Sequence, residues 1–322
     1  ADEPSTWLEQ VYSDTPINTQ VDNGNPSPDG SGFEVTSSSS QPSVVAEMLA
    51  ELNARPGDRV LEIGTGTGWN AALLAHIVGA ENVTTIEIDP DVAAHARAAL
   101  RTNGYGEVTT VVGDGVSGWP ERAPYDRVIS TVGVAAIPYA WVEQTRPGGR
   151  IVAPLTNSYR SPGLAVLTRH RDGTASGRLA GPAAFMGLRA EREPRVRGSD
   201  VVVGPPDTKS VTELHPHHVT GNRAAAIAIG FRVRGISWVW QPVGTLGTLR
   251  FYAPQSRSWA SLELLEQPPY PVAQAGPRRL WDEVTDAYQW WTDAGEPGIK
   301  DWLITVDHEC QRVVLDPGYG TR

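Results

Sequence analysis

The stretch RVLEIGTGTGWNAALLA, residues 59–75, decides the fold of this chain. Its first apolar and β-branched residues predict a buried strand, and the residues after Gly68 have helical periodicity. Three glycines at alternate positions connect the two: Gly64, Gly66 and Gly68. A strand, a glycine turn and a helix in this order are typical of a crossover that binds a nucleotide cofactor.

The spacing of these glycines distinguishes a dinucleotide cofactor from other nucleotide cofactors. The dinucleotide fingerprint requires a glycine where this chain has Trp69, which disfavours a nicotinamide or flavin cofactor. The acidic Glu62 immediately before the turn suits a cofactor that carries a cationic amino acid. We therefore expect S-adenosylmethionine.

Alternating strands and helices follow the glycine turn. Strands are predicted at residues 83–87, 108–112, 125–130 and 150–154, and this pattern indicates an α/β, doubly wound parallel sheet. Glu87 ends one strand, where its carboxylate suits a ribose diol. Asp114, between Gly113 and Gly115, ends the next strand and suits the amino group of an adenine.

A serine run at residues 37–40 precedes a predicted helix that begins at Pro42. Ser40 or Gln41 is expected to cap this helix. Free amides and the helix dipole would make its N-terminus a carboxylate or phosphate site. A flexible serine linker that caps a helix remains the alternative.

The composition predicts four segments. Residues 1–33 have the composition of a flexible segment, either docked on its own domain or acting as a substrate lid. A methyltransferase domain is expected at 34–188, a linker at 189–212, and a tryptophan-rich α+β substrate-recognition module at 213–322. The histidines at 215, 217 and 218 indicate a polar loop rather than a metal site.

Charge and hydropathy exclude other classes of protein. A net charge of −10 disfavours nucleic acid as the main partner, and no apolar run is long enough to span a bilayer. One cysteine and the absence of a visible export signal favour the cytoplasm. The sequence gives no prediction of the oligomeric state.

Four motifs make the chain resemble the protein-L-isoaspartate O-methyltransferases: SSSSQPSVVAEM (37–48), VLEIGTGTGWNAALLA (60–75), VVGDGVSGWPERAPYDRVIS (111–130) and PGGRIVAPL (147–155). The resemblance implies a class I methyltransferase (Rossmann-like) fold. It implies that the substrate carboxylate lies near the Ser-Gln-Pro helix start, with Ser40 and Ser38 as catalytic candidates and Ser37, Ser39, Gln41 and Pro42 as substrate-binding candidates. The implied cofactor-binding set is Glu62, Gly64, Thr65, Gly66, Gly68, Glu87, Ile88, Gly113, Asp114 and Gly115.

Two departures from the family pattern bear on the substrate. The family usually has Thr-Ile-Ser-Gln-Pro where this chain has Ser-Ser-Ser-Gln-Pro, and its repair enzymes are usually much shorter. Longer versions resemble the methyltransferases that modify ribosomally made peptides such as lanthipeptides, lasso peptides and graspetides. The preferred hypothesis is therefore methylation of an aspartate in a constrained peptide, the ester then closing to an aspartimide. The alternatives are repair of isoaspartate in damaged proteins and a non-catalytic scaffold that binds S-adenosylmethionine.

Overall fold

The computed structural model describes residues 4–191, 204–243 and 246–316, which divide into two compact units. Unit 1 comprises residues 1–155, 163–190 and 303–314, and unit 2 comprises residues 156–162, 191–302 and 315–322. The chain therefore crosses between the units more than once.

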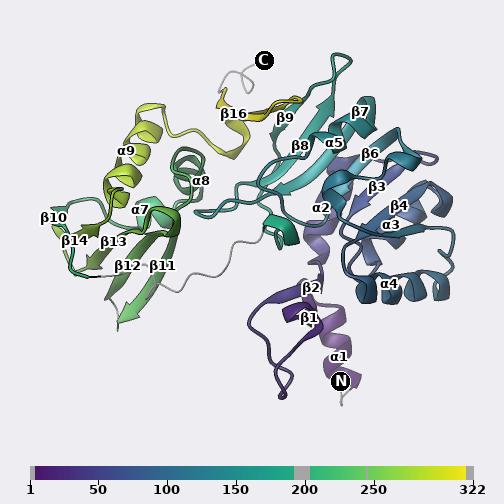
Figure 1. The fold of residues 1–322 in the computed structure, drawn as a ribbon, viewed down its shortest axis with the longest axis horizontal. Coiled ribbons are helices and arrows are strands. Elements are labelled where there is room, and N and C mark those ends of the chain that lie inside the picture. Colours follow the sequence, from purple (N-terminus) through teal and green to yellow (C-terminus); the bar gives the residue numbers. More distant parts are fainter. Residues whose placement is uncertain (1–3, 192–203, 244–245, 317–322) are drawn as a thin grey trace. The chain divides into compact units, whose positions relative to one another are not determined.

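A nine-stranded mixed sheet forms the centre of unit 1 (Figure 1). Five strands pair in parallel in the order β7-β6-β3-β4-β5, and β8, β9, β15 and β16 extend the β7 edge, with antiparallel pairing of β7 to β8, β8 to β9 and β9 to β15. The bounds are β3 (Val60–Ile63), β4 (Val83–Glu87), β5 (Thr109–Val112), β6 (Tyr125–Ser130), β7 (Thr145–Leu155), β8 (Gly163–Arg169), β9 (Ala175–Leu179), β15 (Trp302–Val306) and β16 (Gln311–Leu315). All four residues of β3 are buried, as expected for a central parallel strand.

Helices cover the parallel part of this sheet. The covering helices are α2 (Pro42–Leu52), α3 (Trp69–Val78), α4 (Pro90–Thr102) and α5 (Tyr139–Gln144). Unit 1 also contains α1 (Pro4–Val11) and the short 3₁₀ turns η1 (Asp22–Gly24), η2 (Ala80–Asn82), η3 (Gly115–Ser117), η4 (Pro120–Arg122) and η5 (Arg189–Glu191). Helix α2 contacts β6, β7 and β8, while α3 contacts β3 and β4. Met48 and Leu52 of α2 and Leu74 of α3 share one buried apolar cluster with Ile129 and Val152 of the sheet. Burial of these apolar side chains stabilises the unit.

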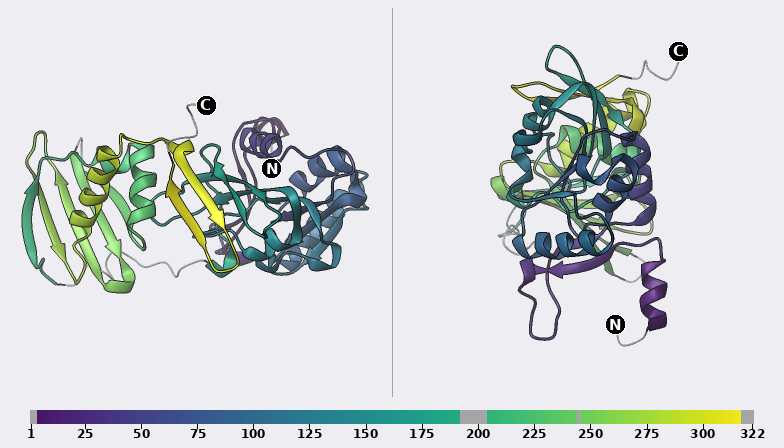
Figure 2. Two further views of the ribbon diagram at one scale, coloured as in Figure 1. Left: turned by 90° about the horizontal axis from the view of Figure 1, so that it is seen from above. Right: turned by 90° about the vertical axis from the view of Figure 1, so that its right-hand side faces the viewer.

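The N-terminal segment has regular structure where the composition predicted a flexible one. In addition to α1, it forms β1 (Ile17–Val21), which pairs antiparallel with β2 (Val35–Ser39). Figure 2 shows this ribbon together with α1. Pairing of the two strands satisfies their backbone N–H and C=O groups, and this orders a segment whose composition is poor in apolar residues.

The linker and the C-terminal module also have boundaries that differ from those predicted from the sequence. The hairpin of β15 and β16, expected in the C-terminal module, adds to the sheet of unit 1. Strand β10 (Thr208–Thr212) lies within the stretch expected to be a linker, of which residues 192–203 fall outside the described chain. Long-range strand pairing has no local sequence signal, which is why these segments were misassigned.

Unit 2 is an antiparallel sheet covered by helices on one face (Figure 2). Its order is β10-β14-β13-β12-β11, with β11 (Ser237–Val243), β12 (Leu246–Ala253), β13 (Ser258–Leu264) and β14 (Tyr270–Ala275). The helices are α7 (His217–Thr220), α8 (Arg223–Arg232) and α9 (Leu280–Asp293), with 3₁₀ turns η6 (Pro254–Ser256) and η7 (Ile299–Asp301). The α+β class expected for this module agrees with this architecture.

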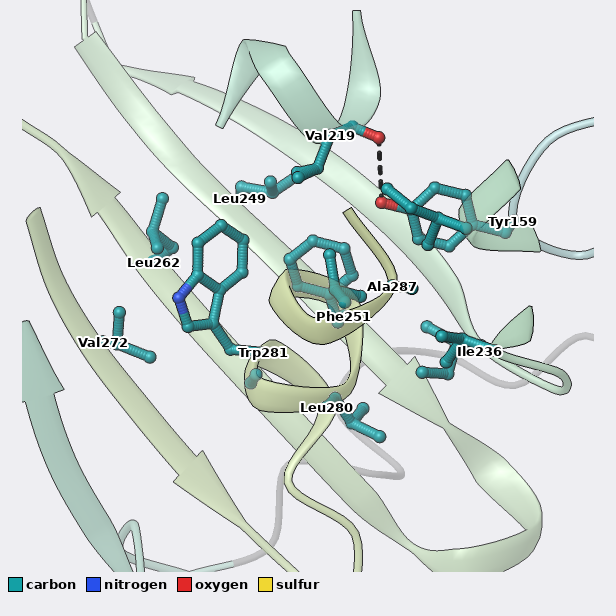
Figure 3. Packing of buried hydrophobic residues seen from close by; sticks show 14 of the residues in the cluster. Tyr159, Val219, Ile236, Leu249, Phe251, Leu262, Val272, Leu280, Trp281 and Ala287 are labelled. Atoms are coloured by element: carbon teal, nitrogen blue, oxygen red, sulfur yellow. Dashed lines mark hydrogen bonds between the residues drawn. The ribbon is translucent and has the colours of Figure 1, made fainter. Parts of the chain in front are cut away.

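Aromatic side chains fill the core between α9 and its sheet (Figure 3). The ring of Phe251 lies 5.8 Å from that of Trp281 and 6.2 Å from that of Tyr159. The buried Tyr159 hydroxyl donates to the carbonyl of Val219 at 3.0 Å. Trp281 thus has a packing role, whereas Trp240 on β11 is exposed.

Candidate active site

The glycine turn after β3 is fixed by the neighbouring strands. The amides of Gly64 and Thr65 both donate to the carbonyl of Ile86, at 2.9 and 3.2 Å. Gly64 has φ +90°, and a Cβ there would lie 2.8 Å from Thr131 Oγ1, so only glycine fits. Thr131, which the sequence did not single out, donates its hydroxyl to the carbonyl of Gly64.

Glu87 lies at the end of β4 with its carboxylate held against this turn. Its Oε2 accepts from the amide of Gly66 at 2.9 Å, and its Oε1 accepts from the amide of Asp89 at 3.2 Å. Each carboxylate oxygen has a further lone pair. The side chain is therefore oriented in advance, as a ribose-binding acceptor requires.

Glu62 lies at the end of β3, before the glycine turn, and its side chain is fully buried. Asn70 Nδ2 donates to Glu62 Oε1 at 2.7 Å, whereas no other described residue donates a hydrogen bond to the buried Oε2. Burial raises the pKa of the Glu62 carboxyl to about 7; the polar side chains of Thr85 and Asn70 oppose this rise, and the charge of Glu87 adds to it. A buried carboxylate without a full set of partners next to the turn fits a site for a cation.

The ends of β4 and β5 present apolar side chains to solvent. Ile88 is 38% exposed and Val112 is 47% exposed, and Val112 pairs with Glu87 in the sheet. Such surfaces suit the faces of an adenine ring. The exposed Asp114 accepts from the amide of Val116 at 3.0 Å, and Gly113 has open space where a Cβ would be.

Gly115, Thr65 and Gly68 have structural roles around the glycine turn. A Cβ at Gly115 would lie 2.4 Å from Ile63 Cγ2, and the Gly115 carbonyl accepts from Trp141 Nε1 at 2.8 Å. The Thr65 hydroxyl is buried and lies 2.7 Å from that of Thr85. Gly68 precedes α3 as its N-cap, in the left-handed conformation. These three residues shape the turn, the strand ends and the start of α3.

Three residues of the serine run, Ser37 to Ser39, belong to strand β2, and Ser40 follows it. Ser37 is buried and accepts from Thr19 Oγ1 at 3.0 Å, while Ser38 and Ser39 pair with Asn18 and Ile17 of β1. A Cβ at Gly66 would lie 3.4 Å from the carbonyl oxygen of Ser38. The strand that leads to Ser40 and Gln41 therefore runs directly beside the glycine turn.

Helix α2 begins at Pro42 as expected, and its N-cap position is occupied by Gln41, one of the two expected residues. The side chain of Gln41 makes no cap hydrogen bond within the described chain. Instead, the amide of Ser43 donates to Asp14 Oδ1 at 2.8 Å. The sequence pattern gives no signal for this contact, because Asp14 lies far from α2 along the chain.

Asp89 connects the N-terminal ribbon to the site. Its Oδ1 accepts from the amides of Asp91 and Val92 and so caps α4. Its Oδ2 accepts from Gln20 Nε2 at 3.2 Å and from Arg189 Nη2 at 3.3 Å. These contacts and the Asp89–Glu87 bond link β1 to the strand end that holds Glu87.

Two further properties concern metals and membranes. Among the residues that the structure describes, no three His, Cys, Asp or Glu side chains are grouped so as to hold a metal ion. Within the same ranges, every helix is too short or too polar to cross a bilayer.

The mixed sheet and the glycine turn define a class I methyltransferase that uses S-adenosylmethionine, and the glycines, Glu62 and Glu87 fit that cofactor. The family model for protein-L-isoaspartate(D-aspartate) O-methyltransferase matches residues 4–193. This chain belongs to that family of carboxyl O-methyltransferases.

Relatives of known name agree with this assignment. Protein-L-isoaspartate O-methyltransferase 2 of Polaromonas sp. is 40% identical over 189 residues, which cover 59% of this chain and 82% of the relative. Protein-L-isoaspartate O-methyltransferase 2 of Archaeoglobus fulgidus is 36% identical over 189 residues, which cover 58% of this chain and 79% of the relative. A solved structure described as protein-L-isoaspartate O-methyltransferase has a TM-score of 0.55 at 22% identity and covers 96% of this chain and 88% of its own, which shows a shared fold.

Proposed function

We propose that this protein transfers a methyl group from S-adenosylmethionine to the carboxylate of an isoaspartyl residue in a peptide or protein. The observation that carries the proposal is the contact between the two halves of the site. The carbonyl of Ser38 lies 3.4 Å from the Cβ position of Gly66, so the strand leading to α2 adjoins the glycine turn. A carboxylate at the start of α2 would lie beside a cofactor held by that turn.

The chain's residues mainly orient the reactants. When bound, S-adenosylmethionine supplies an electrophilic methyl group. The substrate carboxylate is already ionised near neutral pH, so no side chain has to remove a proton. Aligned proximity can lower such a barrier by roughly 7–11 kcal/mol.

The donors at the start of α2 must hold the carboxylate without overstabilising it. Its negative charge is neutralised as the new O–C bond forms and the C–S bond breaks, so strong hydrogen bonds would favour the ground state. The hydroxyls of Ser38 and Ser40 are half-buried and make no hydrogen bond in the described part of the chain. They are suited to weak, orienting contacts.

Methylation converts a poor leaving group into a good one. The backbone nitrogen that follows can then attack the ester carbonyl, release methanol and close a five-membered succinimide. This step needs no further group from the protein.

The relatives support isoaspartate as the substrate better than the constrained peptide preferred from the sequence. That preference rested partly on the length of the chain. A fold covering 96% of this chain also occurs in a structure described as protein-L-isoaspartate O-methyltransferase, so a second unit is no argument for peptide tailoring.

The test uses two synthetic peptides that differ only in one L-isoaspartyl or L-aspartyl linkage. Mass spectrometry after incubation with purified protein and S-adenosylmethionine measures the methyl ester. The proposal expects ester on the isoaspartyl peptide alone. Methylation of neither peptide, with S-adenosylmethionine bound, would contradict it and return attention to a ribosomally made substrate.

A further inference from the structure

An internal carboxylate occupies the start of α2. Asp14 lies in the turn between α1 and β1, and its Oδ1 accepts from the amide of Ser43 at 2.8 Å. Its Oδ2 accepts from Gln41 Nε2 at 3.1 Å. The two oxygens thus bind two donors at the helix start.

Few other donors are available there. Pro42 has no amide hydrogen, and the amide of Val45 already donates to the carbonyl of Gln41. Only Ser43 and Val44 can therefore offer first-turn amides. The hydrogen bond from the Ser43 amide, followed by those from the side chains of Gln41 and Ser43, lowers the pKa of Asp14, so the group is a carboxylate near neutral pH.

We propose that Asp14 is an internal competitor for the substrate carboxylate, and that it must leave Gln41 and Ser43 before an isoaspartyl carboxylate binds there. The inference rests on the proposed function for the identity of the substrate. It adds that the protein carries its own mimic of the group that it methylates. Asp14 thereby sets how strongly a carboxylate must bind in order to be accepted.

The N-terminal helix can be displaced at low cost. The apolar side chains of Trp7, Leu8 and Val11 in α1 are exposed, and so is that of Tyr12, which follows the helix. Asp14 itself is exposed. Release of Asp14 therefore uncovers little apolar surface and breaks two exposed hydrogen bonds.

The ribbon beyond the turn is held separately. Four residues of β1 pair with four residues of β2, and Gln20 is bound to Asp89. Movement of α1 and Asp14 therefore leaves β2 and its contact with Gly66 in place. The hinge is the stretch from Ser13 to Pro16.

The test compares the full chain with Asp14→Ala, with Asp29→Ala as the matched control. Asp29 is another exposed N-terminal aspartate, and its carboxylate accepts from the amide and hydroxyl of Ser31 rather than from Gln41 or Ser43. If Asp14 fills the site in about nine molecules of ten, its removal lowers the KM for the isoaspartyl peptide about tenfold. Asp29→Ala should leave KM unchanged.

A second readout does not depend on methyl transfer. Acetate is titrated while the amide resonance of Ser43 is followed by NMR. Asp14→Ala should shift half-saturation to an acetate concentration about tenfold lower than in the parent protein. Because acetate requires no particular substrate, this result stands even if no isoaspartyl peptide is methylated.

The outcomes are distinct. Equal KM and equal acetate response in Asp14→Ala and the parent would show that Asp14 only caps α2, and would overturn the inference. A raised KM with weaker acetate binding would overturn it too, since Asp14 would then help to build the site. Failure of every variant to methylate the peptide, with a normal acetate shift, would refute the proposed function alone.

Discussion

Replacing Glu62 with glutamine should stabilise the cofactor-free protein while weakening its hold on S-adenosylmethionine. The side chain is fully buried, and its Oε2 accepts no hydrogen bond from the part of the chain that the structure describes. The neutral amide keeps an acceptor for Asn70 Nδ2 and removes the cost of burying a charge. We expect the cation of the bound cofactor, by contrast, to be stabilised by that charge.

The size of the effect follows from the pKa. Burial raises the pKa of Glu62 from 4.5 to about 7. Each pKa unit corresponds to about 1.4 kcal/mol, so the ionised side chain costs the folded state about 3 kcal/mol near pH 8. Because the folded pKa is raised, the contribution of Glu62 to stability is fully present below about pH 4.5 and is lost as the pH rises through about 7. The advantage of the glutamine variant should therefore shrink to about 1 kcal/mol near pH 5.

Two measurements check this prediction. Urea unfolding of the cofactor-free protein should show the glutamine variant more stable near pH 8 than near pH 5, relative to the parent. Calorimetry should show that the affinity of the parent for S-adenosylmethionine rises with pH through about 7, and that the variant lacks this rise. Glu121→Gln on the exposed η4 is the control. A variant no more stable than the parent near pH 8 would refute the account of Glu62.

Three further predictions concern the serine run, the glycines and unit 2. Ser40→Ala should lower turnover on an isoaspartyl peptide and leave the Kd for S-adenosylmethionine unchanged, with Ser38→Ala having a smaller effect; equal kcat at saturating peptide would remove Ser40 from the mechanism. Gly115→Ala should cost about 1–3 kcal/mol of unfolding free energy, because its Cβ would lie 2.4 Å from Ile63, whereas Gly113→Ala, with nothing within 4 Å, should cost little; equal costs in chemical unfolding would contradict the packing described. Trp281→Ala, at the centre of the unit 2 core, should cost that unit about 3–5 kcal/mol by urea unfolding, and a loss below 1 kcal/mol would contradict the burial of Trp281.

The sequence predicted the parallel part of the fold well because its signals are local. Strands β4 and β6 begin and end where the apolar pattern placed them, and α2 begins at Pro42. The predicted and observed elements agree here because each strand and each helix has its own local hydrophobic pattern in the sequence. The S-adenosylmethionine cofactor followed from the spacing of the glycines after β3.

Pairing between distant segments was beyond the sequence. Strand β1 pairs with β2, β15 with β9, and β10 with β14, and none of these partners is marked in the amino-acid pattern. The same holds for side chains that act at a distance, such as Asp14 at Ser43 and Gln20 at Asp89. Glu62 was placed correctly before the turn, but its complete burial depends on the packing of its neighbours.

The most direct test of the account is a crystal structure of the protein with S-adenosylhomocysteine and an isoaspartyl peptide. The account predicts the peptide carboxylate within hydrogen-bond distance of the Ser43 amide, the thioether sulfur on the side of Gly66, and Asp14 displaced. A carboxylate bound away from the start of α2, or one separated from the cofactor by β2, would contradict it.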